Sequence, residues 1–319
     1  MDKADYYQLK RLHLLLIIVV TLAWVRSDYG GGYAGSGLRH GSNAREVSLG
    51  GALCPDKTQK FSTFSNPALM ALLSSYQFGV SYQALSLDRY IRNFNVGFKL
   101  PPKAGLGLAV LQWGTENIQG RNEMNEKENV YSAKETVGLL SFGVSPTRNL
   151  SVGIKIKVIF SALANEYTGK GITQELGILQ RLNNRFYIGL VTKNLSGTYN
   201  WKYSILNEVR AVDELIPREF SIGGAMYLRN GLSLFLQEDI LSMGKNPLNY
   251  RLRCGMEYNL PNGFIFRIGA KQGVGSQFTG MEKYGSFIKP AFGFGFPIRI
   301  SGGNYIHLDY AFDPGTANE

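Results

Sequence analysis

The sequence has little of what most enzymes and metal proteins depend on. Only two of its 319 residues are cysteine and only three are histidine. Cys54 and Cys254 lie too far apart for a metal-ligand motif, and one pair of cysteines does not establish a disulfide. No nucleophile elbow, metal-ligand cluster or Gly-rich phosphate loop is evident. We therefore expect no catalytic site, no metal and no cofactor, and we expect both cysteines to be free thiols.

Charged residues are scarce too, and long apolar runs are missing beyond the N-terminus. Charged side chains make up 18% of the chain, against an average of roughly 25%. A transmembrane helix needs about 20 consecutive apolar residues, so an α-helical membrane protein is not expected. The net charge of +10 favours contact with anionic lipid or an acidic partner. No basic helix or basic-aromatic motif indicates nucleic acid.

The N-terminus has the pattern of a secretory signal. Lys3, Lys10 and Arg11 precede an apolar run from Leu12 to Val25. This run is shorter than a membrane-spanning helix requires, which favours a cleaved signal over an uncleaved anchor. The sequence therefore predicts a signal peptide over residues 1–27.

Glycine and aromatic residues are abundant, with 38 Gly, 18 Tyr and 18 Phe, and residues 250–259 show how they are used. Tyr250 and Tyr258 begin and end an apolar face, while Arg251, Arg253 and Glu257 fall on the opposite face of a strand. A membrane-spanning strand has this pattern over roughly 9–11 residues, with an aromatic side chain at each interface. A half-buried strand of a soluble sandwich also alternates, so the interpretation depends on recurrence.

The alternation recurs along the chain, with charges almost wholly on one face of each strand. It is clear over residues 150–160, 264–271 and 305–312. A charge that faces lipid is costly, so the charged face predicts a barrel lumen. The residues expected in the lumen are Lys155, Lys157, Lys193, Arg251, Arg253, Glu257, Arg267, Lys271, His307 and Asp309. Those expected in the aromatic girdle are Tyr250, Tyr258, Tyr310 and Phe312. Cys254 falls on the lipid-facing side.

The sequence therefore predicts an all-β fold, a transmembrane antiparallel β-barrel over residues 76–319, preceded by residues 28–75, which begin with a flexible segment and lack strand alternation. Turn residues such as Asn230-Gly231 and Pro261-Asn262-Gly263 separate many of the strands. Longer polar loops are expected near 116–131, 197–216 and 276–283. The thirteen expected strands cover residues 76–86, 90–100, 103–115, 132–145, 150–163, 171–181, 185–196, 217–228, 231–242, 247–259, 263–275, 284–297 and 304–313.

An odd number of strands is unusual for such a barrel, because bacterial single-chain barrels normally have an even number. The sequence after Asp313 has the composition of a turn. An open edge in lipid would leave backbone groups unpaired. Either the count of thirteen is wrong or a last strand is missing from this sequence. The second alternative is favoured and gives fourteen strands in a complete chain.

Several segments, in order along the chain, resemble the PorV/PorQ-type outer-membrane proteins within the wider FadL-like barrel superfamily. They are Ala44–Ala52, Asn66-Pro67-Ala68, Gly189–Gly197, Pro217–Tyr227, Gly255–Tyr258 and Leu308–Phe312. The resemblance implies a fourteen-stranded barrel with an N-terminal hatch. Two departures are the missing final strand and Glu175, where the family usually has Asp.

The resemblance implies a location in the outer membrane of a Gram-negative-type bacterium, in contact with outer-membrane lipid, and it leaves two functions open. The favoured one is a component of a protein-export machinery, PorV-like and part of type IX secretion, with secretion proteins or cargo as partners. The alternative is a FadL-like channel for hydrophobic small molecules, with a hydrophobic ligand as partner. Fold alone does not decide between them.

Three local features also keep two interpretations each. Asn66, Pro67 and Ala68 form either a simple turn or the seat of the hatch against the barrel wall. The lumen charges either pair with carboxylates in a solvated interior, which is favoured, or attract an anionic head group or an acidic cargo segment. His307 and Asp309 share a strand face, which fits a lumen hydrogen bond better than an acid–base pair.

Overall fold

The computed structural model describes residues 34–58, 63–164, 167–205, 208–242, 248–274, 286–300 and 304–314. The predicted signal peptide, residues 1–27, lies outside this part of the chain. The helical elements are short: η1 (Ser36–Arg39), α2 (Ala44–Ser48) and η2 (Pro67–Leu72). Within the ranges just given, no helix has the length and apolar character needed to cross a membrane.

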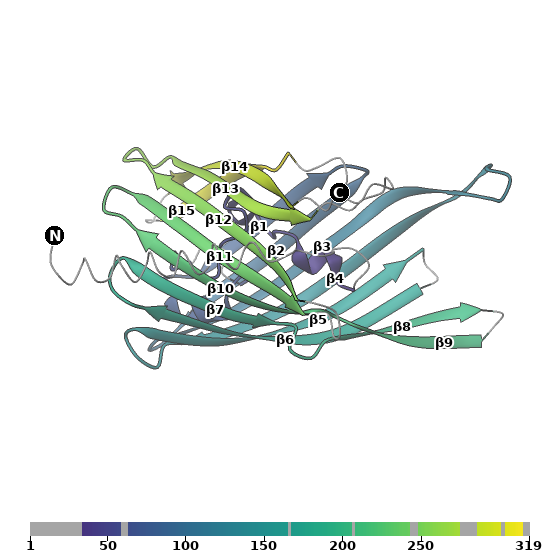
Figure 1. The fold of residues 1–319 in the computed structure, drawn as a ribbon, viewed down its shortest axis with the longest axis horizontal. Coiled ribbons are helices and arrows are strands. Elements are labelled where there is room, and N and C mark those ends of the chain that lie inside the picture. Colours follow the sequence, from purple (N-terminus) through teal and green to yellow (C-terminus); the bar gives the residue numbers. More distant parts are fainter. Residues whose placement is uncertain are drawn as a thin grey trace.

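The rest of the described chain is one antiparallel sheet of fifteen strands. Thirteen strands follow one another along a single path, and the β8–β9 hairpin lies off it, paired to β6 (Figure 1). The strands are β1 (Gln77–Leu85), β2 (Arg89–Leu100), β3 (Ala104–Arg121), β4 (Lys127–Val144), β5 (Leu150–Leu163), β6 (Tyr167–Arg181), β7 (Phe186–Lys193), β8 (Thr198–Ile205), β9 (Glu208–Leu215), β10 (Arg218–Tyr227), β11 (Leu232–Ser242), β12 (Asn249–Asn259), β13 (Ile265–Val274), β14 (Ser286–Arg299) and β15 (Tyr305–Phe312).

The all-β antiparallel prediction is confirmed, and the thirteen path strands are those expected from the alternation. Two loop predictions were wrong. Residues 197–216 hold the β8–β9 hairpin. Its strand β8 alternates aromatic with polar residues, but β9 carries charged and apolar residues on both faces and so lacks the alternation of a wall strand. Residues 116–131 are mostly strand, because β3 and β4 continue as an arm beyond a register shift after Thr115. Both hairpins project at the right of Figure 1.

The sheet is not closed in the part of the chain that the structure describes, because β1 and β15 end the path without pairing to each other. Every pairing along the path is antiparallel, so the first and last of thirteen strands run in the same direction. One further antiparallel strand between them would satisfy both edges. The fourteenth strand therefore stays a prediction.

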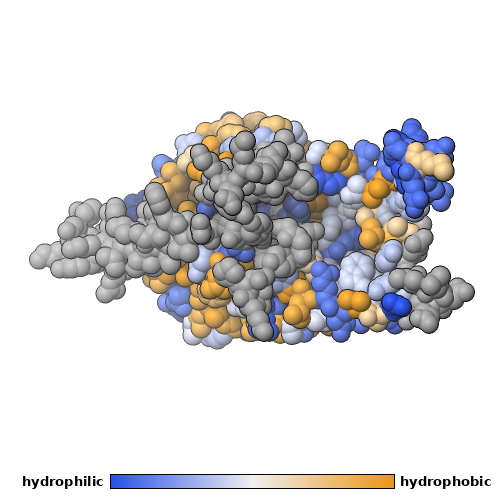
Figure 2. Space-filling view, turned by 45° about the vertical axis from the view of Figure 1, so that its right-hand side comes forward, coloured by the Kyte–Doolittle hydropathy of each residue, from blue (hydrophilic) through white to orange (hydrophobic). Residues whose placement is uncertain are grey.

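The outer surface of the sheet is apolar. One row of facing residues crosses five strands as Phe94, Val110, Gly138, Val158 and Ile172, and its large members are all exposed. Figure 2 shows hydrophobic residues gathered over the body of the molecule, with hydrophilic residues concentrated at the tip at upper right. Such a body, with a polar end, has the surface of a β-barrel that faces lipid.

The inner face of the sheet is covered by the described parts of residues 34–73, which we call the plug. Here η2 packs against β2 to β6, and α2 packs against β13, β14 and β15. The local sequence explains both short helices. The Asn43 side chain caps α2 by accepting from the Glu46 amide, and Gly50 and Gly51 end it with φ values of 63° and 81°. Asn66 caps η2, whose first residue is Pro67.

Candidate functional site: the plugged interior and its mouth

A belt of glycines on the inner face of the wall lets the plug lie directly against the strands. Gly105, Gly143, Gly153 and Gly177 are cross-strand neighbours on β3 to β6. A Cβ atom at Gly153 would lie 2.4 Å from the Pro67 carbonyl carbon, and one at Gly177 would lie 2.0 Å from Asn66 Oδ1. The belt continues on other strands through Gly189, Gly255, Gly269 and Gly293, each of which faces plug atoms. Plug atoms can lie this close to the wall backbone only because the glycines have no side chains.

Asn66, Pro67 and Ala68 are buried at this contact. Asn66 Nδ2 donates to the carbonyl oxygens of Cys54 (2.9 Å) and Ile178 (3.0 Å), and Asn66 Oδ1 accepts from the Ala68 amide (3.0 Å). One side chain thus joins two parts of the plug to β6. The motif makes a local turn and also contacts the wall, so the two interpretations of its sequence are compatible in this geometry.

One cluster of buried charge lies next to η2. Lys155 Nζ donates to the carbonyl oxygens of Phe64 (3.0 Å) and Ser65 (2.6 Å) and to Glu175 Oε2 (2.8 Å). Lys157 pairs with the other oxygen of Glu175. Glu175 therefore balances two wall lysines, one of which holds the plug backbone.

A second cluster joins α2 to the last strands of the sheet. Arg45 is 1% exposed and lies between Asp56 of the plug (2.5 Å) and Glu257 of β12 (2.8 Å). Glu257 also pairs with Arg267 of β13 (2.7 Å), and Arg267 pairs with Asp309 of β15 (2.6 Å). Burial acts to lower the pKa of Arg45, but the two carboxylates hold it above its usual value. Five alternating charges therefore run from the plug to the edge strand.

A third cluster lies beneath residues 51–54 of the plug. Lys193 pairs with Glu219 (2.5 Å), and Arg253 pairs with Asp239 (2.5 Å). The Ser221 hydroxyl lies between the two pairs, 2.7 Å from Asp239 Oδ1 and 3.3 Å from Glu219 Oε1, and can donate its single hydrogen to either carboxylate. Nearby, Gln237 accepts from the Cys54 amide (2.8 Å). Hydrogen bonds therefore hold this part of the plug next to two ion pairs of the wall.

Near Lys57 the plug is held between two aromatic rings, which we call the aromatic clamp. Lys57 Nζ lies 4.2 Å from the ring centre of Tyr227 and 4.8 Å from that of Tyr187. The Tyr227 hydroxyl accepts from the Lys57 amide (2.9 Å) and donates to Asp56 (2.9 Å). Burial lowers the pKa of the Lys57 ammonium.

Between the three charged clusters and the base of the projecting hairpins, the inner wall is apolar. Its buried side chains come from β2 to β5 and β8 and pack against Ala34, Leu38 and Phe64 of the plug. We call this set the apolar band: Ile91, Ala109, Leu111, Val137, Leu139, Ile159 and Tyr199. An apolar surface inside a β-barrel is suited to a hydrophobic solute rather than to water-filled passage.

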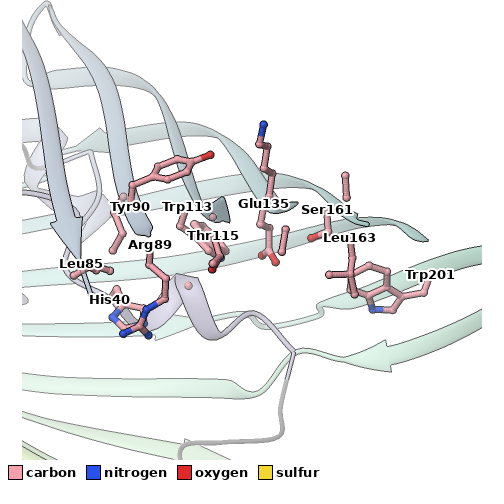
Figure 3. A pocket seen from close by; sticks show the side chains of 16 residues that line it. His40, Leu85, Arg89, Tyr90, Trp113, Thr115, Glu135, Ser161, Leu163 and Trp201 are labelled. Atoms are coloured by element: carbon pink, nitrogen blue, oxygen red, sulfur yellow. The ribbon is translucent and has the colours of Figure 1, made fainter. Parts of the chain in front are cut away.

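A cavity of about 300 Å³ opens above the apolar band, at the base of the two projecting hairpins. We call it the mouth pocket. Figure 3 shows His40, Leu85 and Arg89 at one end and Leu163 and Trp201 at the other, with Trp113, Thr115, Glu135 and Ser161 between them. Tyr199 donates a hydrogen bond to Glu135 and stacks on Trp201. The pocket therefore combines two indole rings with a carboxylate and hydroxyl groups.

The structure brings most of the predicted lumen residues into these clusters. Lys155, Lys157, Lys193, Arg253, Glu257, Arg267 and Asp309 are paired as described, and Lys271 pairs with Asp313 (3.0 Å). Arg251 faces Asp239 across β11 and β12 and is half-buried. His307 is exposed beside Tyr305, and Asp309 is committed to Arg267, which gives an acid–base pair no geometric support.

The predicted girdle residues lie on the outer side of their strands. Tyr258, Tyr310 and Phe312 are exposed and Tyr250 is half-buried. Tyr310 stacks on Phe294 of β14 at 5.2 Å between ring centres. Cys254 is exposed on the same side of β12 as Tyr258, whereas Cys54 is buried in the plug, and both are free thiols.

Sequence reasoning missed Arg45, Asp56 and Lys57, which carry much of the polar contact between plug and wall. It also missed the mouth pocket. The signal for Arg45 was present, because Ala44–Ala52 had been singled out as a motif without a role for its arginine. Trp113 and Trp201 gave no such signal, since one lies in a wall strand and the other in a segment assigned to a loop.

No family model and no curated protein matches this sequence. Solved structures of the same fold do match. The Pseudomonas putida toluene transporter TodX is 12% identical with a TM-score of 0.57, covering 85% of this chain and 92% of that one. A FadL homologue of Pseudomonas aeruginosa is 11% identical (TM-score 0.56; 85% and 88%). The Ralstonia pickettii toluene transporter TbuX is 13% identical (TM-score 0.53; 81% and 90%).

These likenesses show that the chain has the fold of the FadL-type outer-membrane β-barrels. They do not extend to the PorV/PorQ group in particular, because none of these three structures is a secretion component. All three are described as transporters or as a FadL homologue, and none is described as an enzyme.

Proposed function

We propose that the protein is an outer-membrane channel for hydrophobic small molecules, with residues 34–73 acting as its hatch. The observation that carries the proposal is the apolar band inside a barrel that is also apolar outside. A channel for hydrophilic solutes has a polar, water-filled lumen. Here the inner wall is apolar where it packs against Ala34, Leu38 and Phe64 of the plug, and a solute-sized cavity opens beside it.

The fold and the neighbours support the same proposal. The structural match to the two toluene transporters extends over nearly the whole length of each transporter. The protein-export function expected from the sequence has no supporting observation in the described interior, whose charges are paired with each other and with the plug. We therefore propose small-molecule transport in place of export, with lipid and a hydrophobic solute as the partners.

Solute entry in whole cells tests the proposal. A bacterial host that lacks its own hydrocarbon channel would express the protein, and entry of toluene would be compared with entry of a pentose sugar. We expect faster toluene entry and unchanged sugar entry. Equal acceleration of both solutes would indicate an open pore, and acceleration of neither would contradict a channel function.

A matched pair of variants tests whether toluene entry depends on the apolar band. Ala109→Trp fills the band, because Ala109 is 5% exposed on the inner face of β3. Ala84→Trp adds the same side chain to the exposed outer side of β1. We expect Ala109→Trp to remove the toluene effect and Ala84→Trp to keep it. Heat-modifiable migration on gels would check that both variants fold.

A further inference from the structure

We propose that the outer surface of the barrel binds the phosphorylated headgroup of a lipid at four cations, Arg92, Lys134, Lys170 and Lys202, which we call the cationic rim. All four side chains are exposed. The inference goes beyond the proposed function, because it concerns the lipid around the barrel rather than the solute that passes through it.

The cationic rim begins where the apolar outer surface ends. The apolar row through Val110 is followed, two residues nearer the projecting hairpins, by a row that contains Arg92 and Lys170. The next row contains Lys134 and Lys202. In the opposite direction the two nearest rows over β2 to β5 are apolar: Val96, Leu108, Leu140 and Ile156, then Phe98, Leu106, Phe142 and Ile154. The rim therefore borders the lipid-facing surface.

This border lies toward the outer end of the barrel. The turns at the opposite end are short, as at residues 101–103, 145–149 and 182–185, whereas the two long hairpins project beyond the rim (Figure 1). In outer-membrane barrels the short turns face the periplasm and the longer loops face outward. A cation on the lipid side of a strand costs least near an interface. The rim is therefore placed at the level of the headgroups of the outer leaflet.

Arg92 is held in position on the outside of β2. Its Nε donates to Gln112 Oε1 (2.7 Å), and Gln112 Nε2 donates to the Thr136 hydroxyl (2.8 Å), so that three strands share one polar row. The guanidinium carbon also lies 5.1 Å from the ring centre of Tyr90. A guanidinium has five N–H donors, so Arg92 keeps donors for a phosphate while its orientation is already fixed.

Lys170 and Lys202 form the other half of the rim. Lys170 of β6 is directly opposite Asn200 of β8, and Lys202 follows two residues later on β8. Diagonal neighbours of this kind lie about 7–8 Å apart. Neither lysine forms an ion pair within the described residues. Two ammonium groups this close repel each other, and an anion bound between them removes that repulsion.

The carboxylates on this side of the wall do not neutralise the rim. Glu116 lies 4.0 Å from Lys134, but both side chains are about half exposed, and exposed pairs contribute little. Asp213 accepts a hydrogen bond from β8 (2.7 Å), and Asp88 lies in the turn before β2, where its carbonyl oxygen accepts from the Glu116 amide. The other three rim cations form no ion pair in the part of the chain that the structure describes.

A lipid fits this arrangement better than a free anion does. Guanidinium and ammonium groups both bind phosphate. Phe160 and Ala162 of β5 lie between the two halves of the rim and continue the apolar surface between them. A lipid can therefore lay its acyl chains over Phe160 and the apolar rows while its phosphate groups contact the cations on either side.

Native mass spectrometry of the full chain, purified in a non-ionic detergent, measures this binding. The probes are lipid A with two phosphate groups, monophosphoryl lipid A and the zwitterionic lipid phosphatidylethanolamine. We expect affinity to fall in that order, with lipid A bound about tenfold or more tightly than phosphatidylethanolamine. A large excess of inorganic phosphate should not displace lipid A, because a free anion makes no contact with the apolar rows.

Two paired variants locate the binding. Lys170→Gln together with Lys202→Gln should weaken lipid A binding roughly 10- to 30-fold, since each cation near a membrane surface contributes about fivefold. The control is Arg121→Gln together with Lys127→Gln, which removes the same charge from facing positions at the exposed tip of the β3–β4 arm. It should leave the affinity unchanged. Lys170→Arg together with Lys202→Arg should keep the binding.

Equal affinity for the three lipids, or equal loss in the glutamine pair and its control, would overturn the inference. Displacement of lipid A by inorganic phosphate would also overturn it, because the rim would then be a site for a free anion. Heat-modifiable migration on gels checks that each variant folds. The glutamine pair should leave toluene entry unchanged in cells, so the two proposals are tested separately.

Discussion

The plug is fastened to the wall in two different ways on its two sides. On the η2 side the plug is uncharged. Its backbone lies against Gly143 and Gly153, its Asn66 and Pro67 side chains lie against Gly177, and Lys155 donates to its carbonyl groups. On the α2 side the plug supplies a buried charge, Arg45, to a network that reaches β15. The first attachment depends on the absence of side chains and the second on the presence of partners.

The difference predicts how each side fails. The close contact at the glycines is weakened by adding atoms, and the loss of stability depends on how far the neighbouring atoms can move. A buried ion network is weakened by removing one partner, which leaves an uncompensated charge in a site with little water. Cys54 lies between the two sides, tied to Asn66 and Gln237. Modification of its thiol in a Cys254→Ser background therefore reports release of the plug.

The largest effect is expected from Arg45→Met. The substitution keeps the apolar stem and leaves Asp56 and Glu257 with one partner fewer, which costs about 3–5 kcal/mol for a buried pair. The rate of Cys54 modification should rise roughly 100-fold or more if it follows plug release. Arg121→Met, at the exposed tip of β3, is the control and should change nothing. Unchanged Cys54 protection in Arg45→Met would show that the α2 side does not hold the plug.

A smaller effect is expected from Gly153→Ala. The added methyl group would meet Pro67 and Ala68 atoms at 2.4–2.5 Å, and overpacking of this kind costs about 1–3 kcal/mol. Cys54 modification should accelerate by about tenfold. Gly138→Ala places the same methyl group on the outer side of β4, where nothing lies within 4 Å. Equal rates of Cys54 modification in the two alanine variants would show that close contact at Gly153 does not hold the plug.

A still smaller effect is expected from Lys57→Ala. The change removes a cation that contacts Tyr187 and Tyr227, an interaction of about 0.5–2 kcal/mol. The Lys57 amide keeps its hydrogen bond to the Tyr227 hydroxyl, so the clamp is weakened rather than lost. Cys54 modification should rise a few-fold. Lys57→Arg should restore protection, because a guanidinium also stacks on aromatic rings.

The lowest rate of Cys54 modification is expected in the unmutated protein, here placed in lipid vesicles. Burial raises the pKa of the Cys54 thiol, so the reactive thiolate is rare and Cys54 should stay unmodified by any maleimide. Cys254 faces outward and should react with a lipid-soluble maleimide and not with a charged one. Modification of Cys254 by the charged reagent in vesicles would contradict the assignment of this face to lipid.

Particular residues show how far the sequence alone could go. The strand from Tyr250 to Tyr258 was predictable, because alternation assigns each side chain to a face before any partner is known. The β8–β9 hairpin was not, because β9 carries charged and apolar residues on both of its faces and so gives no two-sided pattern. The pairing of Arg45 with Glu257 was also beyond prediction, since it joins positions 212 residues apart.

What the sequence by itself determined is the two-sided character of the sheet. The period of a strand is two, so the order of apolar and charged residues already fixes which side meets an apolar environment. Only the tertiary structure decided which inner residues meet one another. The curl of the sheet brings the plug against strands from β2 to β15. The resulting contacts depend on register and curvature, which no local pattern encodes.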